Sequence, residues 1–172
     1  MPTTDTLFQI IDRMSIAQLK AYHFEKAGNT DAAKLAQEQA DDLRTAGDIY
    51  LYECLRGIRK PMVRPHLRFH DHGKAEGWRS GKDALEGMTD QSSLMETAAV
   101  LAKTHAVHWS HQTHIQWLKE RIRTEGESGP DRQRYESDFV ATQRQIDLCN
   151  QHRNELIQHG DELFAKMLEG TR

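Results

Sequence analysis

The positions of glycine and proline most constrain how this chain can fold. Most of the four prolines and eleven glycines lie near residues 28, 57–65, 73–87 and 126–130, and four long segments between them are nearly free of both. Glycine and proline disfavour helix interiors, and none of the four segments has the alternating pattern of a strand. The sequence therefore predicts four helices, at about 4–27, 30–57, 92–123 and 131–168.

The lengths of the connections predict how the helices are paired. Only a few residues separate the first helix from the second and the third from the fourth, so each pair should form an antiparallel hairpin. We therefore expect an all-α four-helix bundle of two antiparallel hairpins with one long crossover. The 172 residues are the size of a single domain, with the first hairpin at 1–59, the crossover at 60–91 and the second hairpin at 92–172.

The apolar faces of the first two helices predict which of them is central. Leu7 and Ile10 lie on one face of the first helix, whereas Phe8 and Leu19 lie on another. A helix that is apolar on two sides is usually covered on both, so we expect the first helix at the centre. The second helix carries small residues at helical spacing, among them Ala36, Ala40 and Gly47, which predicts close contact with a neighbour.

Four histidines follow one another at every third position in the segment THAVHWSHQTH. Three-residue steps rotate by about 60° around a helix, so the four rings cannot share one face. The helical phase places His105 and His108 within the apolar stripe of the third helix, His111 at its margin and His114 toward solvent. We therefore expect the burial to decrease from His105 and His108 to His114.

An arginine, Arg153, occupies the centre of the apolar stripe of the fourth helix, flanked by Asn150 and Asp161. An unpaired guanidinium in a core costs several kcal/mol, so Arg153 must meet a carboxylate or an anionic ligand. A pair with Asp12 of the first helix is one prediction. The alternative is that Arg153, with Asn150, Lys20 or a histidine, binds a phosphate or carboxylate in bidentate form.

The histidines also allow two kinds of enzyme chemistry. Ligands for iron, copper or zinc would have to come from facing helices, and the candidates are His105, His108, His152 and His159. Acid–base catalysis would use His23, His108 and Asp12. The chain contains no Glu-x-x-His pattern of bundle di-iron proteins and no nucleotide-binding or nucleophile motif. Histidines that are only hydrogen bonded, in the core or at the surface, are the simpler interpretation.

Charge and composition limit the partners and the location. The formal charge of −3 gives no basic field, so a nucleic-acid partner is not expected, although residues 56–74 hold six Lys or Arg against one Asp. This basic segment, with His66, His70 and His72, is either a solvated connector or a site that recruits anions. With no long apolar run and no signal peptide, we expect a cytoplasmic protein without a membrane partner. Cys54 and Cys149 should be reduced core residues.

The segments LFQIIDRMSIAQLKAYHFEK, LAQEQADDL and IDLCNQHRNELIQHGDELF resemble the bacterial family called domain of unknown function 4254. The resemblance covers about half of the chain and implies a helical protein, often found among genes for cell-surface polysaccharide synthesis, without an established activity. The histidine-rich third helix departs from the family pattern. The motif positions of the family carry over onto Asp12, Ser15, Lys20, His23, Asn150, Arg153, Asn154 and Asp161.

Together these features predict an accessory protein that binds an anionic small molecule or an acidic partner through an interior polar site. The residues expected to bind are Arg153, Asn150, Lys20 and Asp161. The alternative is an enzyme that acts on a small molecule through a histidine-bound metal or through histidine acid–base chemistry. Such a bundle could also form a homodimer.

Overall fold

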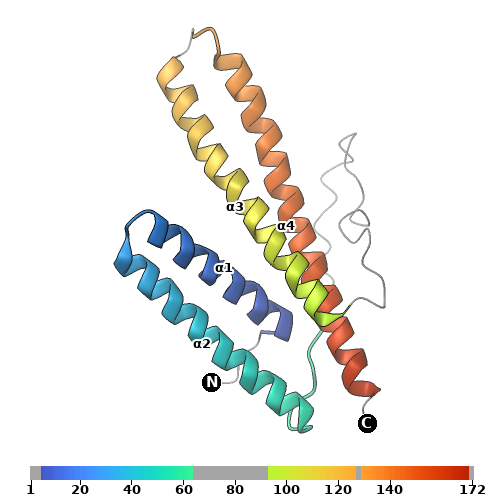
Figure 1. The fold of residues 1–172 in the computed structure, drawn as a ribbon. Coiled ribbons are helices and arrows are strands. Elements are labelled where there is room, and N and C mark those ends of the chain that lie inside the picture. The colour runs from blue at the N-terminus through green and yellow to red at the C-terminus, as the bar shows by residue number, and fades with distance from the viewer. Residues whose placement is uncertain (1–4, 64–92, 127–128, 171–172) are drawn as a thin grey trace.

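The computed structural model describes residues 5–63, 93–126 and 129–170, and most of them are helical (Figure 1). The helices are α1 (Leu7–Lys26), α2 (Thr30–Leu55), α3 (Leu94–Glu125) and α4 (Arg132–Glu169), and the described ranges contain no strand. The predicted all-α bundle of two hairpins is confirmed. Residues 64–92 lie outside the described residues, so the predictions for the crossover, including its basic segment with His66, His70 and His72, stay predictions.

Local signals in the sequence determine where the helices begin and end. Thr6 caps α1 by accepting a hydrogen bond from the backbone N–H of Gln9, and the Gln9 side chain accepts one from the Thr6 N–H in return. Ser93 and Glu96 form the same reciprocal capping box at the start of α3. Gly28 follows α1 with a positive φ of 73°, a conformation that glycine adopts without steric cost.

The two hairpins are joined mainly through α1. Within each hairpin the helices pack along their length, and α1 is also the helix that contacts both α3 and α4. Figure 1 shows that the hairpins meet near the start of α1 and the end of α4, and diverge toward their two short turns. The prediction that the first helix is central is therefore confirmed.

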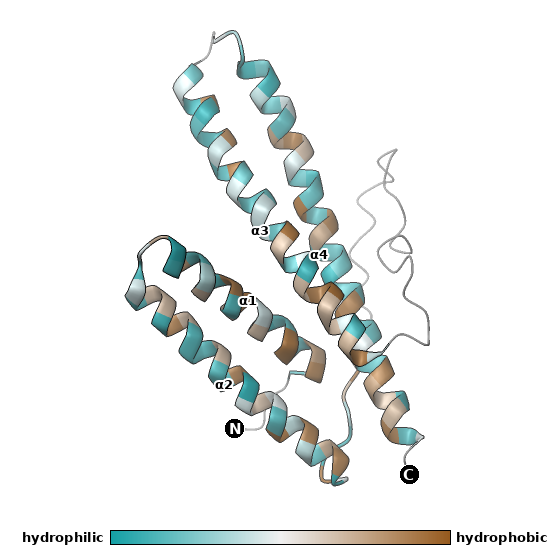
Figure 2. Ribbon diagram, viewed as in Figure 1, coloured by the Kyte–Doolittle hydropathy of each residue, from teal (hydrophilic) through white to brown (hydrophobic). Residues whose placement is uncertain are grey.

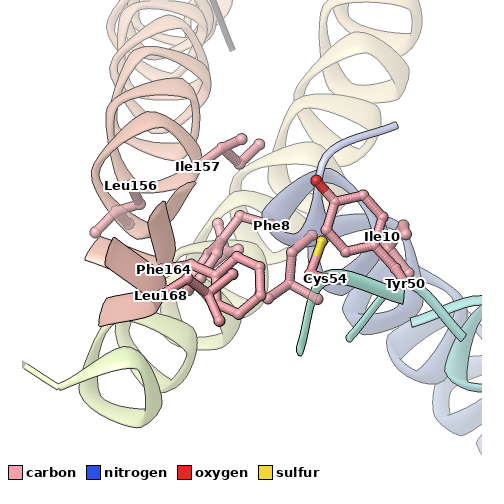
Figure 3. Packing of buried hydrophobic residues seen from close by; sticks show 10 residues of the cluster. Phe8, Ile10, Tyr50, Cys54, Leu156, Ile157, Phe164 and Leu168 are labelled. Carbon is pink, nitrogen blue, oxygen red and sulfur yellow. The ribbon is translucent and has the colours of Figure 1, made fainter. Parts of the chain in front are cut away.

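The main hydrophobic core lies where the hairpins meet. Figure 2 shows apolar residues concentrated at this end, whereas the outer half of α3 and α4 is largely hydrophilic. Side chains from all four helices contribute, and Figure 3 shows Phe8 lying close to Phe164 and Leu168. The cluster comprises Leu7, Phe8, Ile10, Tyr50, Cys54, Leu101, Leu156, Ile157, Phe164 and Leu168.

Two glycines allow close helix contacts with α1. At Gly160 of α4 an added Cβ would lie 2.3 Å from ring atoms of Phe8, so this position has room only for glycine. At Gly47 of α2 an added Cβ would lie 3.5 Å from Ile10, which is an ordinary contact. Ala36 and Ala40 are buried on the same helix, so the predicted close packing of its small residues is confirmed.

The predicted apolar stripes are wrong in two places. The helical phase of α3 that places His105 and His108 in the apolar stripe also places Gln112 there, but Gln112 is exposed, and the hairpins diverge toward the turn that follows α3 (Figure 1). On α4, helical spacing continues the apolar stripe of Arg153 to Leu163 and Met167, but Phe164 and Leu168 are the buried residues. The end of α4 meets α1 and α2 as well as α3, so a different side of the helix is covered there.

Both cysteines are buried, and neither forms a disulfide with a described residue, as predicted. None of the helices in the described ranges combines the length and the apolar character needed to cross a membrane.

Candidate functional site

A buried carboxylate, that of Asp12, connects three helices. Its Oδ1 atom lies 3.0 Å from Nε2 of His105 on α3 and 2.8 Å from Nε of Arg153 on α4. The side chains of Asp12 and His105 are only 5% and 4% exposed, whereas that of Arg153 is 31% exposed. We call these three residues the Asp12 junction.

Arg153 is the permanently charged partner of Asp12 in the junction. Neither nitrogen approaches Oδ1 with the alignment of a hydrogen bond. Both distances are those of close polar contacts, and the contact with Arg153 is an ion pair. A carboxylate that is buried without a counter-ion costs several kcal/mol, and the guanidinium of Arg153 compensates it at all ordinary pH values. The predicted pair of Asp12 with Arg153 is therefore confirmed.

The contact of His105 with Asp12 was not predicted from the sequence. The signal was present, because a histidine in the middle of an apolar stripe needs a polar partner. Helical phase showed that His105 was buried, but it could not show which polar residue of another helix would face it. Its contact with Asp12 ties α3 to α1 in the same way as Arg153 ties α4 to α1.

His108 lies beside the junction and is partly open to solvent. Burial lowers the pKa of its imidazole, and the neighbouring charges of Arg153, His105 and His111 lower the pKa further. Its Nε2 lies 3.3 Å from the side-chain nitrogen of Gln112. Arg153 and two further imidazoles therefore lie near His108, and Asp12 contacts Arg153 and His105.

The predicted gradient of histidine burial holds with one correction. His105 is buried, His111 is half-buried and His114 is exposed, as expected. His108 was predicted to be substantially buried, but it is half-buried. It lies three residues after His105 on α3, toward the turn at which the two hairpins diverge (Figure 1).

The candidates for acid–base catalysis do not converge on one point. His23 stacks on Trp109 of α3, with ring centroids 4.6 Å apart and an interplanar angle of 11°. It lies eleven residues after Asp12 on α1, which corresponds to about three helical turns. His23 therefore forms a second contact between α1 and α3, separate from the Asp12 junction.

The candidates for metal ligation do not form a metal site among themselves. Within the described ranges, no three His, Cys, Asp or Glu side chains are grouped so that they could hold a metal ion. His105 faces Asp12 and Arg153 of α1 and α4, and His108 lies beside them. His152 and His159 are half-buried on α4. The structure therefore gives no support to a site built from these four residues.

The structure separates the remaining ligand candidates from one another. Asp161 is buried, and its Oδ1 accepts a hydrogen bond of 3.0 Å from the backbone N–H of Phe8 in the first turn of α1. Lys20 is exposed and forms no ion pair with any described residue. Asn150 is half-buried, one turn before Arg153. Asn150 is thus the candidate best placed to act beside Arg153.

The protein is helical, and its two hairpins are joined across the buried carboxylate of Asp12. The partners of this carboxylate are the Arg153 guanidinium, which is always charged, and the His105 imidazole, which can be. No family model, curated protein or solved structure matches the chain. The resemblance to the domain of unknown function 4254 therefore depends on the residues quoted above.

Proposed function

We propose that the protein binds a small anionic molecule, carrying a phosphate or carboxylate group, at the Asp12 junction. The proposal rests on the surroundings and the exposure of the Arg153 side chain. Its Nε faces a buried carboxylate, while the side chain remains 31% exposed. A guanidinium fixed in this way through Nε can offer its two terminal nitrogens to an anion, and this fork matches the spacing of phosphate and carboxylate oxygens.

The charges around Arg153 favour an anion over a cation. Arg153, His105 and His111 all lower the pKa of His108, and Asp12 contacts Arg153 and His105. A bound anion would favour the protonated form of His108, so binding should strengthen as the pH falls from about 8 to about 6. Asn150, one turn before Arg153, could donate its amide to the same ligand.

The role in this proposal is that of a cytoplasmic accessory protein. Asp12 positions Arg153 and does not contact the ligand. Thermal unfolding in low salt with inorganic phosphate, pyrophosphate, citrate and a nucleotide sugar tests the proposal. At a ligand concentration of about 100 times Kd, binding should stabilise the folded state by about 2.7 kcal/mol and raise Tm.

Two arginines of the same helix provide the matched comparison. Arg153→Gln should weaken binding of the best anion at least about tenfold, because the fork is lost. Arg144→Gln removes the same charge from an exposed position of α4 and should change the affinity little. Equal affinities of the two variants would contradict the proposal, because the anions would then be responding to net charge alone.

A third variant tests the proposed role of the histidine. His108→Gln should bind at pH 8 about as well as the wild type and lose the increase in affinity toward pH 6.

Elemental analysis of untagged protein tests the alternative function, a metal-dependent enzyme. Stoichiometric iron, copper or zinc would favour a metal-dependent enzyme over the binding protein proposed here.

A further inference from the structure

The face of α2 that points away from α1 is exposed along the whole helix. Positions 35, 38, 42, 45, 49, 52 and 56 recur with the spacing of one helix face, and all of them are exposed. We call this set the outer stripe. α2 packs along α1, and its C-terminal end reaches the core that it shares with α4, so the outer stripe has no partner among the described helices.

The outer stripe is apolar at its centre and oppositely charged on either side. Ile49 and Tyr52 are more than half exposed. Asp42 lies toward the N-terminal side, and no described residue forms an ion pair with it. On the other side, the guanidinium of Arg56 lies over the Tyr52 ring at 6.0 Å, with no described carboxylate bound to it. The two unpaired charges are thus seven residues before and seven residues after Ile49.

We propose that the outer stripe binds the outer stripe of a second copy of this chain, with the two α2 helices antiparallel and Ile49 at the twofold axis. In this register Ile49 packs on Ile49 of the second copy, and Tyr52 lies over Thr45 of the second copy. Arg56 meets Asp42 of the second copy, because each is seven positions from the axis. A parallel pairing would instead place Asp42 against Asp42 and Arg56 against Arg56, so charge complementarity selects the antiparallel one.

The size of the surface predicts a weak dimer. Stable interfaces bury about 800 Å² per partner, and one helix face on each copy offers less than this. We therefore expect a dissociation constant in the micromolar range, with monomer and dimer both populated in solution. The outer stripe shares no residue with the Asp12 junction, so the dimer and the proposed anion site can be tested separately.

Sedimentation equilibrium of the full chain between about 1 and about 200 µM tests the proposal. The wild type should show a reversible monomer–dimer equilibrium. Ile49→Asp places a charge on the twofold axis next to its own copy and should abolish the dimer over this range. Ile49 is exposed, so the helix content by circular dichroism should be unchanged. Val140→Asp, at a similarly exposed apolar position of α4, is the matched control and should leave the equilibrium as it is.

Charge reversal tests the register. Asp42→Arg and Arg56→Asp should each raise the dissociation constant about tenfold, since the twofold axis counts every change twice. The combined variant should restore the affinity of the wild type. A wild type that is monomeric at every concentration, or a dimer that Ile49→Asp leaves intact, would overturn the proposal. Failure of the combined variant to recover would overturn the antiparallel register.

Discussion

Asp12 and Arg153 contact each other, but replacing Asp12 and replacing Arg153 should lower the free energy of unfolding by different amounts. Asp12 is 5% exposed and cannot reach water without moving α1, whereas Arg153 is 31% exposed. Arg153→Met leaves a buried carboxylate with His105 as its remaining partner, and we expect it to lower the free energy of unfolding by about 3 kcal/mol. Asp12→Asn should cost less, since the guanidinium can turn toward solvent. Urea denaturation of the two variants measures both values.

A double-mutant cycle tests whether the contact explains the difference. In the variant Asp12→Asn/Arg153→Met no buried charge is left without a partner, so the double variant should be more stable than Arg153→Met alone. Additive losses would mean that Arg153 stabilises the protein through its aliphatic packing and not through Asp12.

Among the elements, the contact between α1 and α4 depends on a single glycine. A methyl group at position 160 would lie 2.3 Å from the ring of Phe8, which is fully buried, so Gly160→Ala should destabilise the protein by about 1–3 kcal/mol. Gly47→Ala is the matched control, because its methyl group would lie 3.5 Å from Ile10. At position 47 the gain in helix propensity from glycine to alanine, up to about 1 kcal/mol, should exceed any steric cost, so this variant should be more stable. Thermal unfolding should therefore shift Tm in opposite directions for the two variants.

The helices also show how much of the fold could be predicted from the sequence alone. The clusters of glycine and proline and the capping box of Ser93 with Glu96 are local signals, so the four helices and their ends were predictable. The pairing of Asp12 with Arg153 was one of two predictions, because an arginine in an apolar stripe needs a carboxylate or an anionic ligand. Helical phase failed at Gln112 and at Met167, where burial depends on how far the other hairpin reaches.

The partner of His105 was not predictable for the same reason. One helix shows which side of it is buried, but the crossing of two hairpins decides which residues meet there. Lys20, Asn150 and Asp161 match motif positions of the family that the sequence resembles. Asp161, however, is on α4 and accepts a hydrogen bond from the backbone N–H of Phe8 in the first turn of α1. A motif position therefore does not by itself identify a ligand-binding residue.

At the scale of the whole molecule, the two hairpins are held together by an apolar end and a polar junction. The apolar end contains Phe8 and Phe164, whose packing does not depend on pH. The polar junction contains Asp12, His105 and Arg153, with His108 beside them. Acid should therefore weaken the contact between the hairpins through the junction first.

His108 gives this acid sensitivity a definite sign. Its pKa is lowered in the folded state by burial and then by Arg153 of α4 and by His105 and His111 of α3, while Asp12 of α1 contacts Arg153 and His105. Below a pH of about 6.5 the unfolded chain takes up a proton that the folded protein binds less readily, so the free energy of unfolding falls until the folded-state pKa is reached.

Denaturation at about pH 7.5 and about pH 5.5 measures this fall, and His108→Gln should reduce it. His114→Gln, an exposed position on the same helix, provides the control and should leave the fall as large as in the wild type. If His108→Gln loses as much stability on acidification as the wild type, the acid sensitivity comes from other groups. The positive field around Arg153, on which the anion site depends, would then be weaker than the geometry of the junction implies.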